Sequence, residues 1–321
     1  MNRTLFILGG TGFVGHETII QALNAEWQVK TLTRSEEGAK QMRQMGAQPV
    51  MGDIYHSQAW IAETRGATAL IDLTQAKLPR RITRSAMKSL SAQRQAMTRS
   101  LLDAFKRVSA QERPIFFSIS SADDLEPDAH GVLSQDSRPS TKPHGFGYIG
   151  VPVRKLVEAS GLDTTYIYLG SLVYGPGKLF ADIFVTGLKK GSAHVVGKGT
   201  NRPSLVHVTD AARAIVHLAG LPRNALVDHQ FIVMDGAGTS QRELLNETAM
   251  YMGVKKPPTI PAWLAALIVG PIAVETILLD ARVDNSPLRE TGFHFLYPSS
   301  REGVPATLAA LGYVPARVTL A

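Results

Sequence analysis

Short apolar runs alternate along the chain with longer segments in which apolar residues recur at helical spacing. The short runs predict β-strands and the longer segments predict helices that cross between them. Strands are expected near residues 4–8, 28–33, 48–51, 68–73, 114–120, 164–169 and 230–234. Helices are expected near residues 13–24, 36–45, 87–109, 152–160, 209–219 and 240–252. This order predicts an α/β fold with a parallel sheet.

Two segments depart from the alternation. Residues 122–147 are rich in Asp, Pro, Gly, Ser and His and predict a long loop, a type of segment that often covers or forms a site. Residues 261–280 are strongly apolar, and about twenty such residues could span a bilayer. Gly270, Pro271 and Glu275 interrupt them, so the favoured interpretation is two packed helices of a C-terminal domain, and contact with a membrane surface is the less favoured alternative.

A glycine motif follows the first predicted strand directly. Residues 4–15 read TLFILGGTGFVG, so a buried strand leads into Gly9, Gly12 and Gly15 and then into a helix. In this context one glycine permits the tight turn, one lets backbone amides approach a pyrophosphate, and one lets helix and strand pack closely. The motif predicts a dinucleotide site of the Rossmann type. Its expected contacts are Gly9, Thr11, Gly12, Phe13, Val14 and Gly15.

The second predicted strand ends in Arg34 and Ser35. An NAD-preferring site would place Asp or Glu here, on the ribose 2′-hydroxyl. A guanidinium instead suits a 2′-phosphate, which it can bind bidentately. We therefore expect Arg34 and Ser35 to contact the cofactor, and NADP to be preferred over NAD.

Composition narrows the chemistry further. The 321 residues include no cysteine, which excludes disulfides, thiolate zinc sites and cysteine nucleophiles, and no metal site is predicted. The net charge is +7, and residues 77–107 carry nine basic side chains against one acid, Asp103. This stretch is interpreted as a solvated helix face, with an interface or anionic-ligand contact left open; no nucleic-acid-binding motif accompanies it. Because the fold starts at Thr4 without a preceding leader, a cytoplasmic protein is expected.

Further blocks resemble a known family. Together with the glycine motif they make the chain similar to extended and atypical short-chain dehydrogenases/reductases, the epimerase/dehydratase-like and NmrA-like proteins. The blocks are GDI at 52–54, SISSA at 118–122, SGLD at 160–163, LVYGPG at 172–177, VHVTDAA at 206–212 and TGFHFLYP at 291–298.

The resemblance implies a domain organisation. A dinucleotide-binding Rossmann domain, with a doubly wound parallel sheet, would comprise residues 1–171 and 206–235. A smaller substrate domain would comprise residues 172–205 and 236–321. A small-molecule substrate is the expected partner, and the sequence permits a homodimer.

The resemblance also assigns site residues. Asp53 and Ile54 would lie by the adenine. Asp72, Leu73 and Thr74 would end the fourth strand beside the nicotinamide ribose, so Leu73 and Thr74 are expected cofactor contacts. Ser121 would match the catalytic Ser/Thr of the family, which hydrogen-bonds a substrate carbonyl or hydroxyl.

The catalytic Tyr-x-x-x-Lys pair of the family is missing. Counting from the neighbouring blocks places Phe146 at the tyrosine and Gly150 at the lysine. Neither can exchange a proton, so the nearest phenol, Tyr148, is the expected substitute donor. Pro152 predicts a helix that begins near residue 152, which would leave Tyr148 in the preceding loop and separate it from Lys155.

The block at 206–212 contains the histidine of most interest. Its pattern predicts a strand followed by a helix that Thr209 or Asp210 caps, with a structural role for His207.

Three functions compete on these grounds. The favoured hypothesis is an NADP-dependent oxidoreductase that acts on a small, partly apolar carbonyl or enone compound, with Ser121 and Tyr148 at the reacting oxygen. The second is a non-catalytic NADP-binding redox sensor or assembly protein of the NmrA-like kind, which the missing pair supports. The third is a nucleotide-sugar epimerase or dehydratase, in which the basic stretch would meet phosphates.

Overall fold

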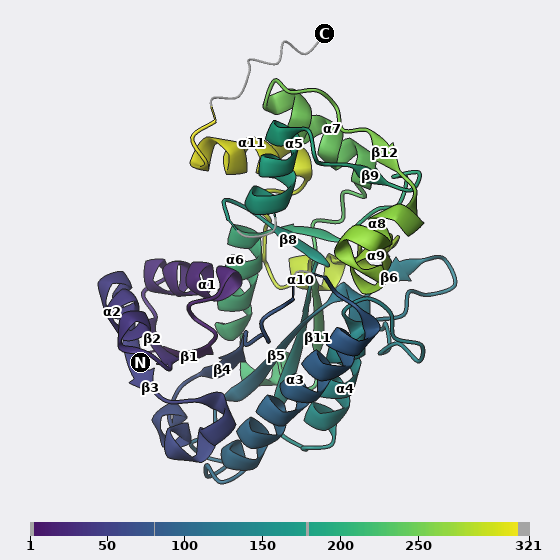
Figure 1. Ribbon diagram of the computed structural model, residues 1–321. Helices are drawn as coiled ribbons and strands as arrows, with labels where there is room; N and C mark the ends of the chain where they lie inside the picture. The colour runs from purple at the N-terminus through teal and green to yellow at the C-terminus, as the bar shows by residue number, and fades with distance from the viewer. Residues whose placement is uncertain (1–2, 80, 178–179, 314–321) are drawn as a thin grey trace.

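A twisted parallel sheet forms the centre of the computed structural model, which describes residues 3–79, 81–177 and 180–313 (Figure 1). The described part of this sheet has seven strands in the order β3-β2-β1-β4-β5-β7-β11, and every neighbouring pair is parallel. The order reverses between β1 and β4, as in Rossmann folds. The strands are β1 (Thr4–Leu8), β2 (Gln28–Thr33), β3 (Gln48–Met51), β4 (Ala69–Asp72), β5 (Ile115–Ser121), β7 (Thr164–Leu169) and β11 (Gln230–Val233).

Helices cover both faces of the sheet, because successive strand side chains point to opposite faces. In β1, Leu5 and Ile7 pack with α1 (Phe13–Asn24), α2 (Glu36–Met45) and α6 (Val208–Ala219). Phe6 and Leu8 pack on the other face, with α3 (Arg84–Phe105) and α4 (Gly147–Glu158). The strands are apolar on both sides, which is the composition that a sheet buried on both faces requires.

A second part of the molecule lies above the carboxyl ends of the strands in the view of Figure 1. It has its own apolar core, which includes Leu172, Tyr174, Phe180, Leu244 and Leu308. Its main elements are β8 (Leu172–Tyr174), α5 (Thr186–Lys190), β10 (Leu205–His207), α7 (Gln241–Tyr251), α8 (Ala262–Val269), α9 (Pro271–Ile277) and α11 (Ser300–Ala310).

Short elements complete the described chain. They are the 3₁₀ turns η1 (Ile54–Ala59), η2 (Ile61–Thr64), η3 (Ala122–Asp124) and η5 (Arg223–Ala225), the π-helical turn η4 (Phe180–Val185), the helix α10 (Ser286–Glu290), and the strands β6 (Val132–Leu133), β9 (Val195–Val196), β12 (Thr259–Ile260) and β13 (Arg282–Val283).

The predicted strands and most of the predicted helices are present, and residues 261–280 do form two helices, α8 and α9. The predicted start of α4 near residue 152 is wrong, because the helix begins at Gly147 and contains Pro152. Proline lacks the N–H that would bond the carbonyl four residues earlier. The Ser91 hydroxyl of α3 donates to that carbonyl, Tyr148 O, at 2.8 Å. A tertiary contact therefore makes the proline tolerable inside the helix.

In the part of the chain that the structure describes, no helix is long and apolar enough to cross a membrane.

Candidate functional site

The glycine motif forms a tight turn that only glycine permits at two of its positions. Gly9 has φ +80°, and a Cβ on it would lie 2.6 Å from Leu73 O. A Cβ on Gly15 would overlap Gly9 O, because α1 packs directly on the turn. Gly12 has φ −77°, and a Cβ there would lie 3.0 Å from Gly9 O. Among the three glycines of the motif, Gly12 is therefore the one at which the fold restricts an added side chain least.

The first turn of α1 opens onto this same turn. Gly12 is the N-cap, and no side chain caps the amides that follow it in the described structure. The first amides of a helix have no intrahelical acceptor and attract anions. Uncapped amides behind a glycine-only cradle therefore fit the pyrophosphate of a dinucleotide. Phe13 turns its ring toward the second part of the molecule, where a Cβ on Gly177 would lie 3.3 Å from it.

The predicted residues of β4 lie beside the motif, at the switch point of the sheet. Leu73 N–H donates to Leu8 O at 3.1 Å, and Thr74 follows at the carboxyl end of the strand. Asp72 is buried and accepts hydrogen bonds from Thr74, at 3.1 Å from the amide and 2.5 Å from the hydroxyl. Its other oxygen forms an ion pair of 2.6 Å with Arg94 of α3. Arg94 is thus a buried exception within the basic stretch, while Arg84, Lys88 and Arg99 are exposed as predicted.

Two predicted contacts lie after β2, next to β1 in the sheet. Arg34 is exposed and forms no ion pair with any described acidic residue. Ser35 caps α2 by accepting from Gly38 N–H at 3.2 Å. Its side chain therefore has a structural partner, whereas the Arg34 guanidinium is available to a ligand.

Asp53 and Ile54 follow the neighbouring strand β3. Asp53 caps η1 by accepting from Tyr55 N–H at 3.0 Å, and its carbonyl accepts from Trp60 Nε1 at 2.9 Å. Ile54 is buried. The structure thus lines up the predicted cofactor residues along the carboxyl edge of β1, β2, β3 and β4.

Ser121 ends β5, one strand beyond β4 at the same edge. It precedes two acids that the sequence analysis did not single out, Asp123 and Asp124, both almost fully buried in η3. Asp123 accepts from Phe146 N–H at 2.9 Å and from the Thr276 hydroxyl at 2.7 Å. Burial raises the pKa of Asp123, although these hydrogen bonds oppose the shift.

Asp124 packs against Gly150, the residue that counting along the sequence assigns to the family lysine. A Cβ on Gly150 would overlap both carboxylate oxygens of Asp124. The carboxyl group accepts a hydrogen bond of 2.5 Å from the Ser120 hydroxyl. Burial raises the pKa of Asp124 well above its usual range. In this structure a side chain at residue 150 would require the Asp124 carboxyl group to move.

Tyr148 is a helical residue rather than a loop residue, which corrects the expectation from the sequence. It lies in the second position of α4 and packs, half-buried, against the cluster of Ile82, Met87, Leu90 and Ile272. Ala76, two residues beyond Thr74, packs against the same cluster. Tyr148 thus lies near the chain that leaves β4. Lys155, seven residues later on the same helix, is exposed.

His207 has the expected structural role, but the cap assignment was wrong. The N-cap of α6 is His207 itself, and its Nδ1 accepts from Thr209 N–H at 3.2 Å. Asp210 instead accepts from the Leu296 and Tyr297 amides at 2.8 and 2.7 Å. Burial lowers the pKa of His207 to about 4, so the ring is neutral and can accept this bond.

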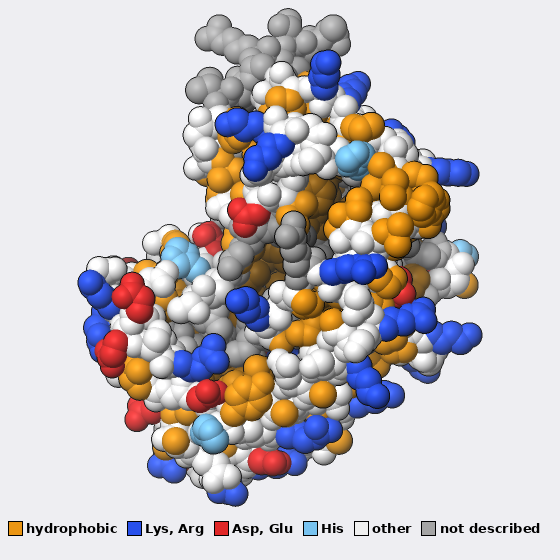
Figure 2. Space-filling view, in the orientation of Figure 1, with side chains coloured by type: hydrophobic (Ala, Val, Ile, Leu, Met, Phe, Trp, Pro, Cys, Tyr) orange, Lys and Arg blue, Asp and Glu red, His pale blue; other side chains and the backbone are white. Residues whose placement is uncertain are grey.

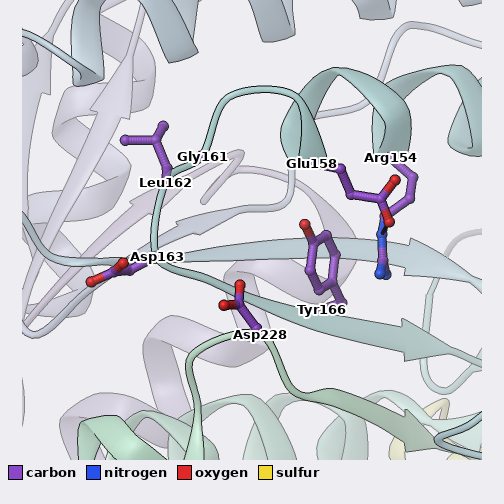
Figure 3. Close-up of a pocket in the computed structure, with 7 residues that line it drawn as sticks. All are labelled: Arg154, Glu158, Gly161, Leu162, Asp163, Tyr166 and Asp228. Carbon is purple, nitrogen blue, oxygen red and sulfur yellow. Dashed lines mark hydrogen bonds and ion pairs between the residues drawn. The ribbon is translucent and has the colours of Figure 1, made fainter.

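Two cavities lie away from these residues. One, of about 400 Å³, is lined by Arg154, Glu158 and Tyr166 among others (Figure 3). It lies at the amino end of β7, the edge opposite the glycine motif. Arg154 and Glu158 point toward each other there and form an ion pair of 2.6 Å, so the cluster has a structural explanation. The second, of about 350 Å³, is lined by residues 202–205, 235–238 and 281–283.

The carboxyl edge faces a hollow in the surface. Figure 2 shows this hollow between the two parts of the molecule, with hydrophobic side chains at its upper wall. Ligands of open α/β sheets bind outside the carboxyl ends of the strands, at the switch point. The hollow, and neither of the two cavities, therefore has the location expected of the site.

The residues that sequence reasoning missed are Ser120, Asp124 and Arg94. The sequence did carry one signal for Asp124: glycines at 147 and 150 leave a bare stripe on α4 that can accept a neighbouring segment. Arg94 carried no such signal, since it lies within a run of exposed basic residues.

Comparisons with known proteins agree with this geometry. Residues 5–233 match the NAD dependent epimerase/dehydratase family. An uncharacterized protein of Schizosaccharomyces pombe is 26% identical over 221 residues, which cover 66% of this chain and 69% of that protein. The photosystem II assembly factor Ycf39 of Trieres chinensis is 32% identical over 74 residues, a match that spans only 23% of each chain.

A solved structure extends the likeness over the whole fold. Human epimerase family protein SDR39U1, crystallised with NADPH, superposes with a TM-score of 0.76 at 16% identity, over 95% of this chain and 99% of the human one. At that identity the likeness concerns the fold alone, whereas the family match covers most of the chain. The protein is a member of the NAD dependent epimerase/dehydratase family, whose proteins bind a nicotinamide dinucleotide on a Rossmann fold of the short-chain dehydrogenase/reductase type.

Proposed function

We propose that the protein is an NADP(H)-dependent oxidoreductase that acts on a small, partly apolar carbonyl or enone compound. The observation that carries the proposal is the arrangement of one edge of the sheet, where the glycine cradle, Arg34 and Ser121 follow β1, β2 and β5. The hydrophobic wall of the hollow above this edge suits a partly apolar substrate (Figure 2). The NADPH bound to the human structural neighbour is consistent with the choice of cofactor.

The residues that would hold the dinucleotide have separate tasks. The amides at the start of α1 would bind the pyrophosphate, and Arg34 would bind the 2′-phosphate. Leu73 and Thr74 would bound the nicotinamide end, at the carboxyl end of β4. The Asp72–Arg94 ion pair would keep this end rigid, because both partners are buried. When bound, the nicotinamide supplies or accepts the hydride.

The chain must then orient the substrate oxygen and supply a proton to it. Ser121 would hydrogen-bond that oxygen, and Tyr148 would donate the proton from its phenol. Tyr148 is proposed because it packs against the same cluster as Ala76, near the end of β4. Asp124 is only 1% exposed, which favours a structural role beneath Ser120.

Turnover of four variants tests the assignment of the proton donor. With a carbonyl substrate found by screening NADPH consumption, Tyr148→Phe should lower kcat by about 10²–10⁴-fold, because a general acid contributes on that scale. Ser121→Ala should lower it by about 10²–10³-fold, the usual effect of losing one hydrogen-bond donor to the reacting oxygen. Cofactor affinity should stay nearly unchanged. Asp124→Asn keeps the shape without the acid, and Arg99→Gln is an exposed control on α3; both should retain turnover within a few fold. A drop below tenfold in Tyr148→Phe would clear this residue, and a large drop in Asp124→Asn would transfer the role to the buried acid.

The cofactor preference gives an independent prediction. We expect NADP(H) to bind more tightly than NAD(H), and Arg34→Ala to weaken NADP(H) by about ten- to a hundredfold, since one charge-assisted contact contributes about 1.5–3 kcal/mol. NAD(H) affinity should hardly change. Calorimetric titration of both cofactors measures this, with Lys40→Ala, an exposed basic residue on α2, as control. An unchanged preference in Arg34→Ala would remove this residue from the cofactor site.

A second candidate function is a non-catalytic NADP-binding sensor or assembly protein. It is favoured by Phe146 and Gly150 at the positions of the family pair, and by the match to an assembly factor over 74 residues. Under this proposal NADP(H) still binds, but no screened substrate consumes NADPH above the protein-free rate. The same screen therefore separates the two candidates.

A further inference from the structure

Helix α8 exposes large apolar side chains to solvent. Trp263, Leu267 and Ile268 are 67%, 59% and 63% exposed, which are the highest values among the large hydrophobic residues described. Trp263 and Leu267 are four positions apart and lie one above the other, while Ile268 extends the exposed area around the helix, to about 140° from Trp263. Figure 2 shows hydrophobic side chains gathered over α8 into one continuous area. Contiguous apolar areas of this kind mark interaction sites on protein surfaces.

The opposite side of α8 packs against the rest of the fold. Ala265 is buried with Val196 and Val274, in a cluster that joins α8 to β9 and α9. The helix is therefore anchored in the fold through small and medium side chains. Its largest side chains are left outward, although the fold does not need them there.

Basic residues flank this face on one side. Ile82 N–H donates to Val269 O at 2.9 Å, and Ile272 N–H donates to Ile82 O at 3.3 Å. These bonds hold the start of α3 against the junction of α8 and α9. Gly270 allows the close approach, because a Cβ there would overlap the backbone of Ile82. Arg81, Arg84 and Lys88 are consequently exposed beside α8.

A second basic pair precedes α8 in sequence. Lys255 and Lys256 are exposed immediately before β12, the strand that leads into the helix. No acidic residue occurs in the sequence from 254 to 274 or from 73 to 102. The apolar face thus lies between segments that carry positive charge only, and Figure 2 shows Lys and Arg side chains above and below it.

We propose that the exposed face of α8, with Arg81, Arg84, Lys88, Lys255 and Lys256 around it, docks on an anionic membrane surface. Trp, Leu and Ile would enter the headgroup region, and the basic residues would bind anionic lipids, as in helices that lie in the membrane interface. This proposal takes up the less favoured of the two interpretations of residues 261–280, contact with a membrane surface. The helix has only eight residues, so it would lie on the surface rather than span it.

Charge argues against a second copy of this chain as the occupant. A two-fold interface through α8 would bring the same basic residues of both copies together, and like charges across an interface oppose association. An acidic protein partner could satisfy the charge, but it would also need an apolar pocket shaped for Trp263. The lipid surface satisfies both requirements.

Trp263 reports docking directly, because the other tryptophans, Trp27 and Trp60, are 5% and 2% exposed. We expect a blue shift of tryptophan emission, and co-sedimentation, when the full chain meets vesicles of phosphatidylcholine with about a third phosphatidylglycerol. Vesicles of phosphatidylcholine alone should produce little of either. Trp263→Phe should lose the shift while still sedimenting.

Substitutions separate the two contributions. Arg84→Gln/Lys88→Gln should weaken vesicle binding about thirtyfold, since each basic residue near an anionic surface contributes roughly 1 kcal/mol. Leu267→Ser/Ile268→Ser should weaken it at least tenfold. The matched controls are Lys106→Gln/Arg107→Gln at the far end of α3 and Met250→Ser, an exposed apolar residue of α7. Both should bind vesicles as the unchanged protein does.

Two results would overturn the proposal. One is an absence of sedimentation with anionic vesicles at low salt, or binding that the α8 and α3 substitutions leave unchanged. The other is a dimer in sedimentation velocity that Trp263→Ser dissociates, which would assign the face to a second copy. Because NADP(H) titration is independent of these measurements, failure here leaves the proposed function unaffected.

Discussion

Gly150→Ala is expected to lower the free energy of unfolding by about 1–3 kcal/mol, because the new methyl group would overlap both carboxylate oxygens of Asp124 in a buried contact. The neighbours cannot easily yield. Asp124 is fixed by its bond to Ser120, and Gly147 of the same helix already lies against the backbone of Asp123. Chemical denaturation followed by far-ultraviolet circular dichroism measures the loss.

A double-mutant cycle isolates this contact. Asp124→Ala removes the carboxylate, so adding Gly150→Ala to it should cost about 2 kcal/mol less than Gly150→Ala costs alone. Gly187→Ala is the matched control, since it is also helical and its Cβ would meet atoms no closer than 3.3 Å. The control should stay within about 1 kcal/mol of the unchanged protein. Additive costs in the cycle would show that Asp124 does not restrict the side chain at residue 150.

Gly12→Val is expected to reduce affinity for NADP(H) by at least about a hundredfold while the protein stays folded, because the branched side chain fills the approach of the pyrophosphate to the first turn of α1. Gly12 has ordinary backbone angles, and the fold leaves nearly enough room for a Cβ. Calorimetric titration measures the affinity, and thermal unfolding checks the fold.

Gly15→Ala distinguishes the two uses of glycine within the motif. Its Cβ would overlap Gly9 O, so it should destabilise the fold itself by about 1–3 kcal/mol or more. The predicted contrast is a folded protein without cofactor binding for Gly12→Val and a destabilised one for Gly15→Ala. Retention of NADP(H) affinity in Gly12→Val would contradict the assigned cradle.

The sequence alone predicted the fold class, the seven strands of the main sheet and the place of the glycine motif. These features depend on residues that are close together in the sequence. Apolar runs of strand length, helical periodicity and glycine at turn positions act through neighbouring residues, and parallel strands joined by crossover helices leave few topologies. Arg34, Leu73, Thr74 and Ser121 could be placed at one edge for the same reason, since each is the last residue of a predicted strand or follows it directly.

The proton-donor region could not be predicted in this way, because its conformation depends on contacts between distant segments. Pro152 indicated a helix start, yet α4 begins five residues earlier. The proline leaves the carbonyl of Tyr148 without a helical donor, and the hydroxyl of Ser91 from α3 donates a hydrogen bond to it instead. Helix α6 is capped by a hydrogen bond from Thr209 N–H to Nδ1 of His207. The ring nitrogen can accept this bond because burial lowers the pKa of His207 and keeps the ring neutral.

Charge and exposure show the same division. The sequence shows how many basic residues lie in 77–107, but it does not show which of them are buried. Arg94 forms an ion pair with Asp72 of β4 in the core, whereas Arg84 and Lys88 are exposed to solvent. The sequence shows that residues 261–280 are apolar. It does not show which side of α8 the fold leaves exposed. The pattern along a chain determines which residues share an element and a face. Burial, ion pairing and the pKa of an acid depend on what packs against that face, and this is decided only when remote segments meet.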